Sequence, residues 1–210
     1  MKKVIAQIIE TKTPNAHLLC RRDVIQDMVR ELDETWTRKT LRDLRRKSKC
    51  NHGEEHTADI VEAYSPPRIT AAAKRLGMKA SFALDMTTTD ERGIPWDFTQ
   101  HHIRHKALGL LDHVKPWMLM LSPPCVAFST LQNFNYTKIP VDEVRQKPEH
   151  GIMHFAFATL LCRRQAQAGR YFAMEHPASA TSWTTQLANA LGRVPNARAV
   201  QFDFCMLGMA

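Results

Sequence analysis

The chain has 210 residues, of which 44% are hydrophobic, and a formal net charge of +8. This length and apolar content suit one ordinary folded domain with an extension and exclude a disordered tail. No run of 18 apolar residues occurs, and the apolar stretch after Met1-Lys2-Lys3 is interrupted by Gln7 and Glu10. We therefore expect neither a membrane span nor a secretory signal, and predict a soluble intracellular protein.

The cysteines and histidines predict reduced thiols and no metal site. The five cysteines are odd in number, widely spaced and free of any Cys-x-x-Cys pair, which argues against a disulfide framework or a zinc knuckle. Cys50-x-His52 with His56, and His101 with His105, are the two groupings closest to a metal site. Neither supplies four ligands at a familiar spacing.

Much of the positive charge lies early in the chain. Residues 38–49 contain seven basic side chains against the single acid Asp43. Apolar residues recur at helical spacing before them, so residues 22–47 predict one or two amphipathic helices in a basic extension, residues 1–57. The basic stretch is either a solvated helix face or a surface for DNA phosphates, with these candidate contacts: Arg42, Arg45, Arg46 and Lys47.

From residue 58 onward, predicted strands and helices alternate. The strands are expected at 59–63, 81–84, 117–121, 171–174 and 198–204. The helices are expected at 69–76, 102–114, 151–167 and 182–191, with a long polar loop at 131–149. Gly77 and Gly192 follow two of these helices, as helix ends favour. The alternation predicts an α/β domain over residues 58–210, built on a doubly wound, mostly parallel sheet.

Chemically useful side chains follow four of the predicted strands: Tyr64, Asp85, Cys125 and Glu175. In doubly wound sheets, ligands bind at the carboxyl ends of the strands near the topological switch point. We therefore expect these four side chains at one functional rim.

Cys125 follows two prolines at the end of an apolar strand. Pro123 and Pro124 cannot continue a sheet ladder, so they end the strand and stiffen the turn that carries the thiol. Two interpretations follow. Cys125 is either a packed core thiol, as free cysteines often are, or a nucleophile held on a rigid loop.

The segment Pro124-Cys125-Val126-Ala127-Phe128-Ser129 resembles the Pro-Cys-x-x-Phe-Ser loop of the DNA (cytosine-5) methyltransferases. Glu175-His176-Pro177 is similar to that family's Glu-Asn motif, with histidine in place of asparagine. The resemblance covers roughly residues 58–207 and implies a Rossmann-like domain that methylates DNA. It implies that Cys125 is the nucleophile, that Glu175 recognises the base, and that Phe128 and Ser129 lie beside the DNA. The family's target-recognition segment would follow residue 208, so a divergent or truncated member is expected.

The same resemblance implies S-adenosylmethionine as methyl donor. The residues implied to bind it are Tyr64, Ser65, Asp85 on the ribose, Asp97 near the adenine, and Pro124. Two of the acids also have structural interpretations: Asp85 as a turn or N-cap residue, and Glu175 as a helix cap or ion-pair partner. The family's glycine-rich donor loop is replaced here by Ser65-Pro66-Pro67-Arg68, in which two residues lack an N–H.

Two alternatives stay open. Ser122-Pro123-Pro124 also resembles the Ser-Pro-Pro-aromatic motif of the amino-group DNA methyltransferases, although position 125 is a cysteine. The proline-containing donor loop would suit a non-catalytic nucleic-acid-binding module derived from a methyltransferase.

Overall fold

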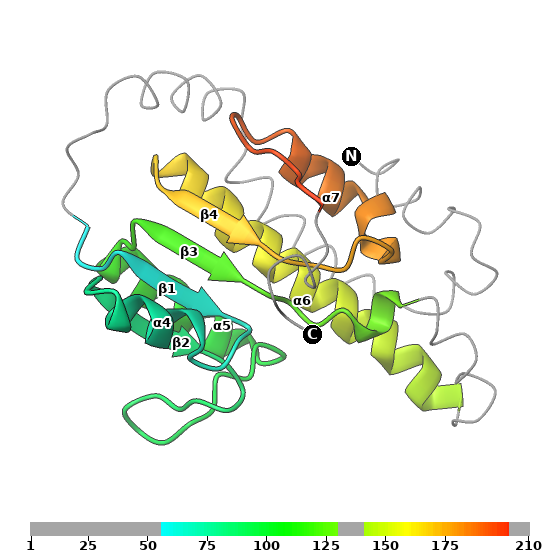
Figure 1. Cartoon of the computed structure of the whole chain (residues 1–210). Coiled ribbons are helices and arrows are strands. Elements are labelled where there is room, and N and C mark those ends of the chain that lie inside the picture. Colours follow the sequence, from blue (N-terminus) through cyan, green and yellow to red (C-terminus); the bar gives the residue numbers. More distant parts are fainter. Residues whose placement is uncertain (1–55, 130–140, 202–210) are drawn as a thin grey trace.

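The computed structural model describes residues 56–129 and 141–201, with the side chains of the second range described from residue 147 onward. Its described strands are β1 (Ile60–Ala63), β2 (Ala80–Leu84), β3 (Met118–Leu121) and β4 (Tyr171–Met174). These strands form one sheet in the order β2-β1-β3-β4, and every neighbouring pair is parallel (Figure 1). The described part is therefore an α/β fold with a parallel sheet, compatible with a Rossmann-like architecture.

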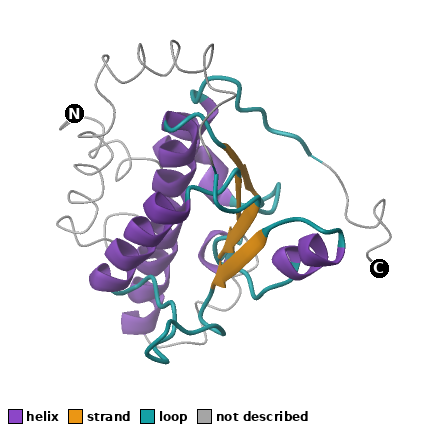
Figure 2. Ribbon diagram, turned by 90° about the vertical axis from the view of Figure 1, so that its left-hand side faces the viewer, coloured by secondary structure: helices purple, strands orange, loops and turns teal. Residues whose placement is uncertain are grey.

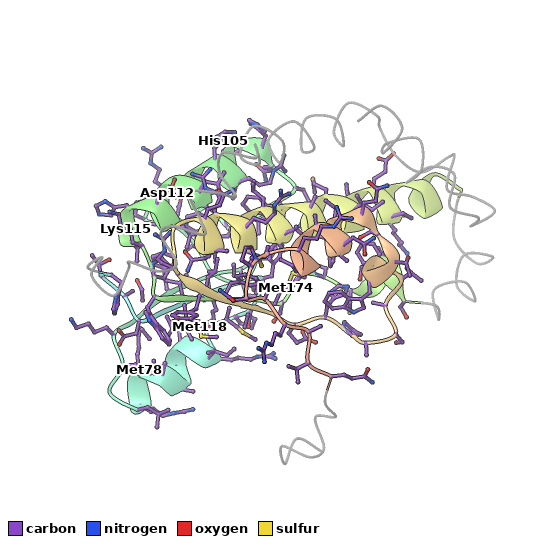
Figure 3. All side chains as sticks on the ribbon, turned by 90° about the horizontal axis from the view of Figure 1, so that it is seen from above. Met78, His105, Asp112, Lys115, Met118 and Met174 are labelled. Carbon is purple, nitrogen blue, oxygen red and sulfur yellow. The ribbon has the colours of Figure 1, made fainter. Side chains whose placement is uncertain are left out.

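Helices lie on both sides of the sheet, as Figure 2 shows with the sheet edge-on. On one side, α4 (Ile69–Arg75) contacts β1 and β2. On the other lie α5 (His101–Val114) and the long helix α6 (Val141–Gln167). Figure 3 shows His105 and Asp112 on α5 and Lys115 directly after it, across the sheet from Met78, which follows α4. Because both faces are covered, strands such as β1 are buried along their whole length.

A buried carboxylate in β1 fixes the start of α4. The Glu62 side chain is fully buried and accepts hydrogen bonds from the backbone N–H groups of Ile69 at 3.2 Å and Thr70 at 3.0 Å. These N–H groups lie in the first turn of the helix and have no partner within it. Glu62 thereby joins the central strand to the helix behind the proline-containing loop.

Helices α5 and α6 close the core on the opposite face. Ile103, Ala107 and Leu111 lie on one stripe of α5 and are buried in the main cluster. An ion pair between Arg164 and Asp112, with 2.7 Å between Nη2 and Oδ2, connects the two helices. The helix predicted at residues 102–114 is thus confirmed.

Most of the predicted elements over residues 58–192 are confirmed, but α6 differs from its prediction. The sequence predicted a polar loop to residue 149 and a helix from 151, whereas the helix begins at Val141 and contains Pro148. Proline removes one backbone hydrogen bond from a helix, and here the remaining turns continue through that loss. The polar residues before 151 had suggested a loop because they carry no apolar stripe.

Two predictions near the end of the domain were wrong. The single helix expected at 182–191 is divided into the 3-10 turn η5 (Thr181–Thr184) and the helix α7 (Gln186–Gly192). Thr185 separates them and caps α7, because its hydroxyl accepts a hydrogen bond from the Ala188 N–H. The strand expected at 198–204 is not formed over residues 198–201, and residues 202–204 lie outside the described part.

The basic extension, residues 1–57, lies almost wholly outside the described residues, so its predicted helices stay predictions. Within the described part of the chain, no helix is both long enough and apolar enough to cross a membrane.

Candidate active site

Hydrogen bonds extend the sheet by one residue beyond β1, β3 and β4. The backbone N–H of Tyr64 donates to the Leu84 carbonyl at 2.9 Å. In the same way, the N–H of Ser122 donates to the Ala63 carbonyl at 3.2 Å, and the N–H of Glu175 donates to the Leu121 carbonyl at 2.8 Å. Asp85 directly follows β2. The row across the carboxyl edge therefore consists of Tyr64, Asp85, Ser122 and Glu175, and Cys125 lies three residues beyond Ser122.

The chain changes direction across the sheet at β1. From β1 it passes to β2 on one side, and then returns to β3 on the other. A crevice is expected between the carboxyl ends of β1 and β3, because the connections diverge there. Tyr64 follows β1 and the Pro123-Pro124 turn follows β3, so these residues flank the crevice.

A pocket of about 220 Å³ opens at this crevice. Its walls combine three aromatic rings with two carboxylates and an imidazole, contributed by Tyr64, Asp85, Met86, Trp96, Asp97, Phe98, Thr99, Pro124 and His154. Four of the five residues implied to bind the methyl donor are among them. Ser65 is not among them, and its hydroxyl donates to the neighbouring Pro66 carbonyl at 3.0 Å.

The two pocket acids sit in the same kind of turn. Asp85 Oδ1 accepts from the N–H and hydroxyl of Thr87, and Asp97 Oδ1 accepts from the N–H and hydroxyl of Thr99. The turn interpretation of Asp85 is therefore confirmed, and the same residue lines the pocket. Asp97 Oδ2 accepts from the Gln100 side chain at 3.0 Å, whereas Asp85 Oδ2 accepts no hydrogen bond from the described residues. Asp85 thus keeps one carboxylate oxygen for a ligand.

Tyr64 has an unusual backbone conformation for its residue type. Its φ of 63° lies in the left-handed region, which costs a non-glycine residue about 1–2 kcal/mol. The ring is fixed by an edge contact with Phe98, at 4.8 Å between centroids, and by a hydrogen bond from its hydroxyl to the His154 carbonyl at 3.2 Å. Burial raises the pKa of Tyr64, so the hydroxyl stays protonated and serves as a hydrogen-bond donor.

His154 is a pocket residue that sequence reasoning missed. It lies on α6, and its ring stands edge-on to Tyr64 at 5.5 Å. Burial is the main cause that lowers its pKa to about 4, with the nearby His150 adding to the effect and Asp97 opposing it. Its Nδ1 is buried and has no hydrogen-bond partner among the described residues. Its position in an apolar helix gave no signal, because only tertiary packing brings it to the rim.

Lys106 holds the wall of the pocket that contains Trp96. Its Nζ lies 2.5 Å from Asp90 Oδ2 and 2.7 Å from Glu91 Oε1, and 5.6 Å from the centre of the Trp96 ring. The Asp90 side chain is only 2% exposed, and its hydrogen bond with Lys106 is the main cause that lowers its pKa to about 2. The segment between β2 and α5 is therefore anchored to α5.

The thiol of Cys125 is half-buried at the start of the 3-10 turn η2 (Val126–Phe128). The other described cysteine, Cys162, is fully buried in the main core, and burial raises the pKa of its thiol well above the usual range. The core-packing interpretation thus describes Cys162 and not Cys125. The 122–129 loop places Cys125 directly after Pro124, which lines the pocket.

Helix α6 and the turn η5 support the cysteine loop. A Cβ placed on Gly151 of α6 would lie 2.3 Å from the Cβ of Ala127, so glycine is required where the helix meets the loop. The Thr181 hydroxyl donates to the Phe128 carbonyl at 3.2 Å. Phe128 itself is 7% exposed and packs on Phe155 at 5.6 Å. The predicted contact of Phe128 with DNA stays a prediction, and most of the ring is covered by this packing.

Glu175 is half-buried at the end of β4, and its carboxylate makes no hydrogen bond or ion pair with the described residues. The alternative of a helix cap or ion-pair partner thus finds no support there. Ser129 is half-buried at the end of the described segment. The predicted DNA contacts Arg42, Arg45, Arg46 and Lys47 lie outside the described residues.

The histidine grouping on α5 brings two ring nitrogens together. The Nε2 atoms of His101 and His105 are 3.0 Å apart on the exposed side of the helix. Among the described residues, no group of three or more potential metal ligands occurs.

Comparisons of the chain with protein-family models, with curated proteins and with solved structures found no match.

Proposed function

We propose that this protein is a DNA (cytosine-5) methyltransferase that uses S-adenosylmethionine. The observation that carries the proposal is the junction of pocket and loop. Pro124 lines the pocket, and the next residue, Cys125, presents a half-buried thiol. A methyl donor bound in the pocket would lie beside a cytosine held at that thiol. Glu175 follows the neighbouring strand at the same edge of the sheet.

The pocket fits the nucleoside part of the methyl donor. Tyr64, Trp96 and Phe98 offer aromatic surface to a base, and the free Oδ2 of Asp85 offers an acceptor to ribose hydroxyls. Its volume of about 220 Å³ is below the roughly 300–1,000 Å³ of typical ligand pockets, so part of the donor would extend along the crevice toward Cys125. Pro66 and Pro67 supply no N–H there, which predicts weak binding of the amino-acid end.

The chemistry proposed for the rim is covalent activation of the base. The base is first unstacked from the duplex. The Cys125 thiolate then adds to carbon 6 of cytosine, and the new sulfur–carbon bond makes carbon 5 nucleophilic. Glu175 in its protonated form would hydrogen-bond nitrogen 3 and stabilise the charge that develops during addition. S-adenosylmethionine would supply the electrophilic methyl group that carbon 5 accepts, and its sulfur–methyl bond electrons would leave with S-adenosylhomocysteine. Loss of the carbon 5 proton to solvent then returns an electron pair to the ring, which expels Cys125 as thiolate.

The direct test incubates the full chain with methyl-labelled S-adenosylmethionine and duplex DNA. We expect label in 5-methylcytosine after hydrolysis of the DNA to nucleosides. If calorimetry shows that the methyl donor binds, yet no label enters 5-methylcytosine on any duplex of mixed sequence, the proposed reaction is wrong.

A non-catalytic nucleic-acid-binding module is the second candidate. The observation in its favour is the Ser65-Pro66-Pro67 loop, which lacks the backbone N–H groups that a glycine-rich loop provides. Calorimetric titration with S-adenosylmethionine separates the two candidates, since the enzyme must bind the methyl donor. Salt-sensitive DNA binding without any donor binding would favour the module.

The amino-group methyltransferase alternative is weaker. Its chemistry needs an exposed aromatic ring after the two prolines to stack on the base. Position 125 is a cysteine, and the nearest ring in the loop, Phe128, is buried against Phe155. Label found in N4-methylcytosine or N6-methyladenine would restore this alternative.

A further inference from the structure

The buried ring of His176 connects the cysteine loop to the strand end that carries Glu175. His176 follows Glu175 in sequence and is 8% exposed. Its ring centroid lies 5.7 Å from that of Phe128, 5.3 Å from Phe155 and 5.8 Å from Trp183. Three rings from three different segments thus surround one imidazole.

Phe128 brings the cysteine loop into this cluster of rings. Its backbone N–H donates to the Cys125 carbonyl at 2.9 Å, so the residue that contacts His176 also closes the turn that Cys125 opens. A change in the position of the Phe128 ring would therefore move the thiol.

The Pro123 backbone lies close enough to the imidazole to oppose the lowering of its pKa. Neither ring nitrogen reaches regular hydrogen-bond geometry with any described residue, so this is a weak polar contact. Proline has no N–H, so Pro123 and Pro124 can only accept hydrogen bonds. Their carbonyls need N–H or O–H donors from other segments of the chain. Since Pro123 precedes Cys125 and Phe128 follows it, His176 contacts the loop on both sides of the thiol.

The polar ring at this position needs a reason. A buried polar group without regular hydrogen bonds destabilises a fold, so a phenylalanine would fill the same space at lower cost. Burial lowers the pKa of His176, while the Pro123 backbone opposes that shift, and the ring is neutral at pH 7 with one N–H. The carbonyl of Pro123 is the acceptor nearest in kind to what that N–H needs, because a carbonyl oxygen accepts and proline has no N–H to offer.

We infer that His176 is a positioning residue, which holds the Pro123–Phe128 loop so that Cys125 and Glu175 act on the same base. The catalytic consequence rests on the proposed methyltransferase function. The restraint on the loop rests on the contacts of His176 alone, so the two are tested by separate measurements.

The test compares His176→Phe with the wild-type protein. Iodoacetamide alkylation at neutral pH is followed on the Cys125 peptide by mass spectrometry, which separates this thiol from the other cysteines. We expect alkylation at least about threefold faster, because the half-buried thiol becomes more exposed when the loop loosens. We expect methyl transfer at saturating substrates at least about tenfold slower, with unchanged affinity for S-adenosylmethionine.

Two further variants make the result decisive. Trp183→Phe alters the same ring cluster away from the loop backbone and should leave alkylation of Cys125 unchanged. His176→Gln keeps an N–H for Pro123 and should return both rates toward wild type, and it also serves if the phenylalanine variant does not fold. Equal alkylation rates in wild type, His176→Phe and His176→Gln would overturn the positioning role, whether or not the protein methylates DNA. If His176→Phe speeds alkylation of Cys125 but the wild-type protein transfers no methyl group, the positioning role stands and only the proposed function is wrong.

Discussion

The two halves of the carboxyl edge are built by different means. On the β1–β2 side, Asp85 and Asp97 are held by hydrogen bonds to a threonine two residues later, and they line a pocket. On the β3–β4 side, Cys125 is held by prolines and by packed rings around His176. The β1–β2 side keeps polar atoms available around the pocket, and the β3–β4 side fixes the backbone of the cysteine loop.

Under the proposed function, the two halves of the rim would have different roles. A pocket with an available carboxylate oxygen suits a ligand that binds and leaves, whereas a thiol on a braced turn suits a bond that forms at one geometry. Under the proposed function, changes on the β3–β4 side should slow the reaction without altering affinity for the methyl donor. Changes on the β1–β2 side should weaken that affinity.

The largest effect is expected from Cys125→Ser. Loss of the thiolate nucleophile should reduce incorporation of label into 5-methylcytosine to background, since an alcohol adds poorly to carbon 6. Binding of S-adenosylmethionine, measured by calorimetry, should not change. Cys162→Ala is the matched control, because that thiol is buried in the core and away from the rim. Full activity in the serine variant would show that Cys125 is not the nucleophile.

Glu175→Gln tests the other group on the same side. The amide keeps the shape of the side chain but cannot supply an acidic proton, so turnover should fall by about 10²–10⁴-fold, the usual contribution of general acid catalysis. The dissociation constant for the methyl donor should stay the same. If the variant had normal turnover but bound the methyl donor more weakly, Glu175 would belong to the donor site and not to the reaction with the base.

Asp85→Asn should act on the pocket instead. Removing the charge from the carboxylate with the free Oδ2 is expected to weaken donor binding by about 10-fold, the value of one hydrogen bond to a charged group. Asp112→Asn makes the same chemical change on α5, where Asp112 pairs with Arg164, and should leave donor binding unaltered. If calorimetry gave equal affinities for wild type and Asp85→Asn, Asp85 would not bind the methyl donor.

The smallest effect concerns stability and pH. Burial lowers the pKa of His154 to about 4, below the ordinary value of 6.5, so the unfolded chain takes up this proton more readily than the folded protein. The contribution of His154 is therefore complete above pH 6.5 and is lost as the pH falls toward 4. Urea unfolding across this range should show a smaller loss in His154→Leu than in wild type. The slope should not vanish, because burial also lowers the pKa of His176. Parallel pH profiles would mean that His154 is not buried as described.

Local signals in the sequence determined the main elements and the order of the rim. Prolines 123 and 124 end β3, Gly77 ends α4 with a φ of +79°, and apolar runs mark all four described strands. These signals act over a few neighbouring residues, so they can be recognised without knowledge of the rest of the chain. Because the carboxyl ends of parallel strands share one edge, the same signals predicted that Tyr64, Asp85, Cys125 and Glu175 follow strands at that edge.

Tertiary packing alone decided which residues line the pocket and which pack around the cysteine loop. His154 reaches the pocket from α6, Phe128 turns into the core, and His176 packs against Phe128 of the cysteine loop. The extent of α6 was also hidden, because its first turns carry no apolar stripe and contain Pro148. Contacts of this kind join residues far apart in the chain, and their free energy depends on burial and shape that no short segment encodes.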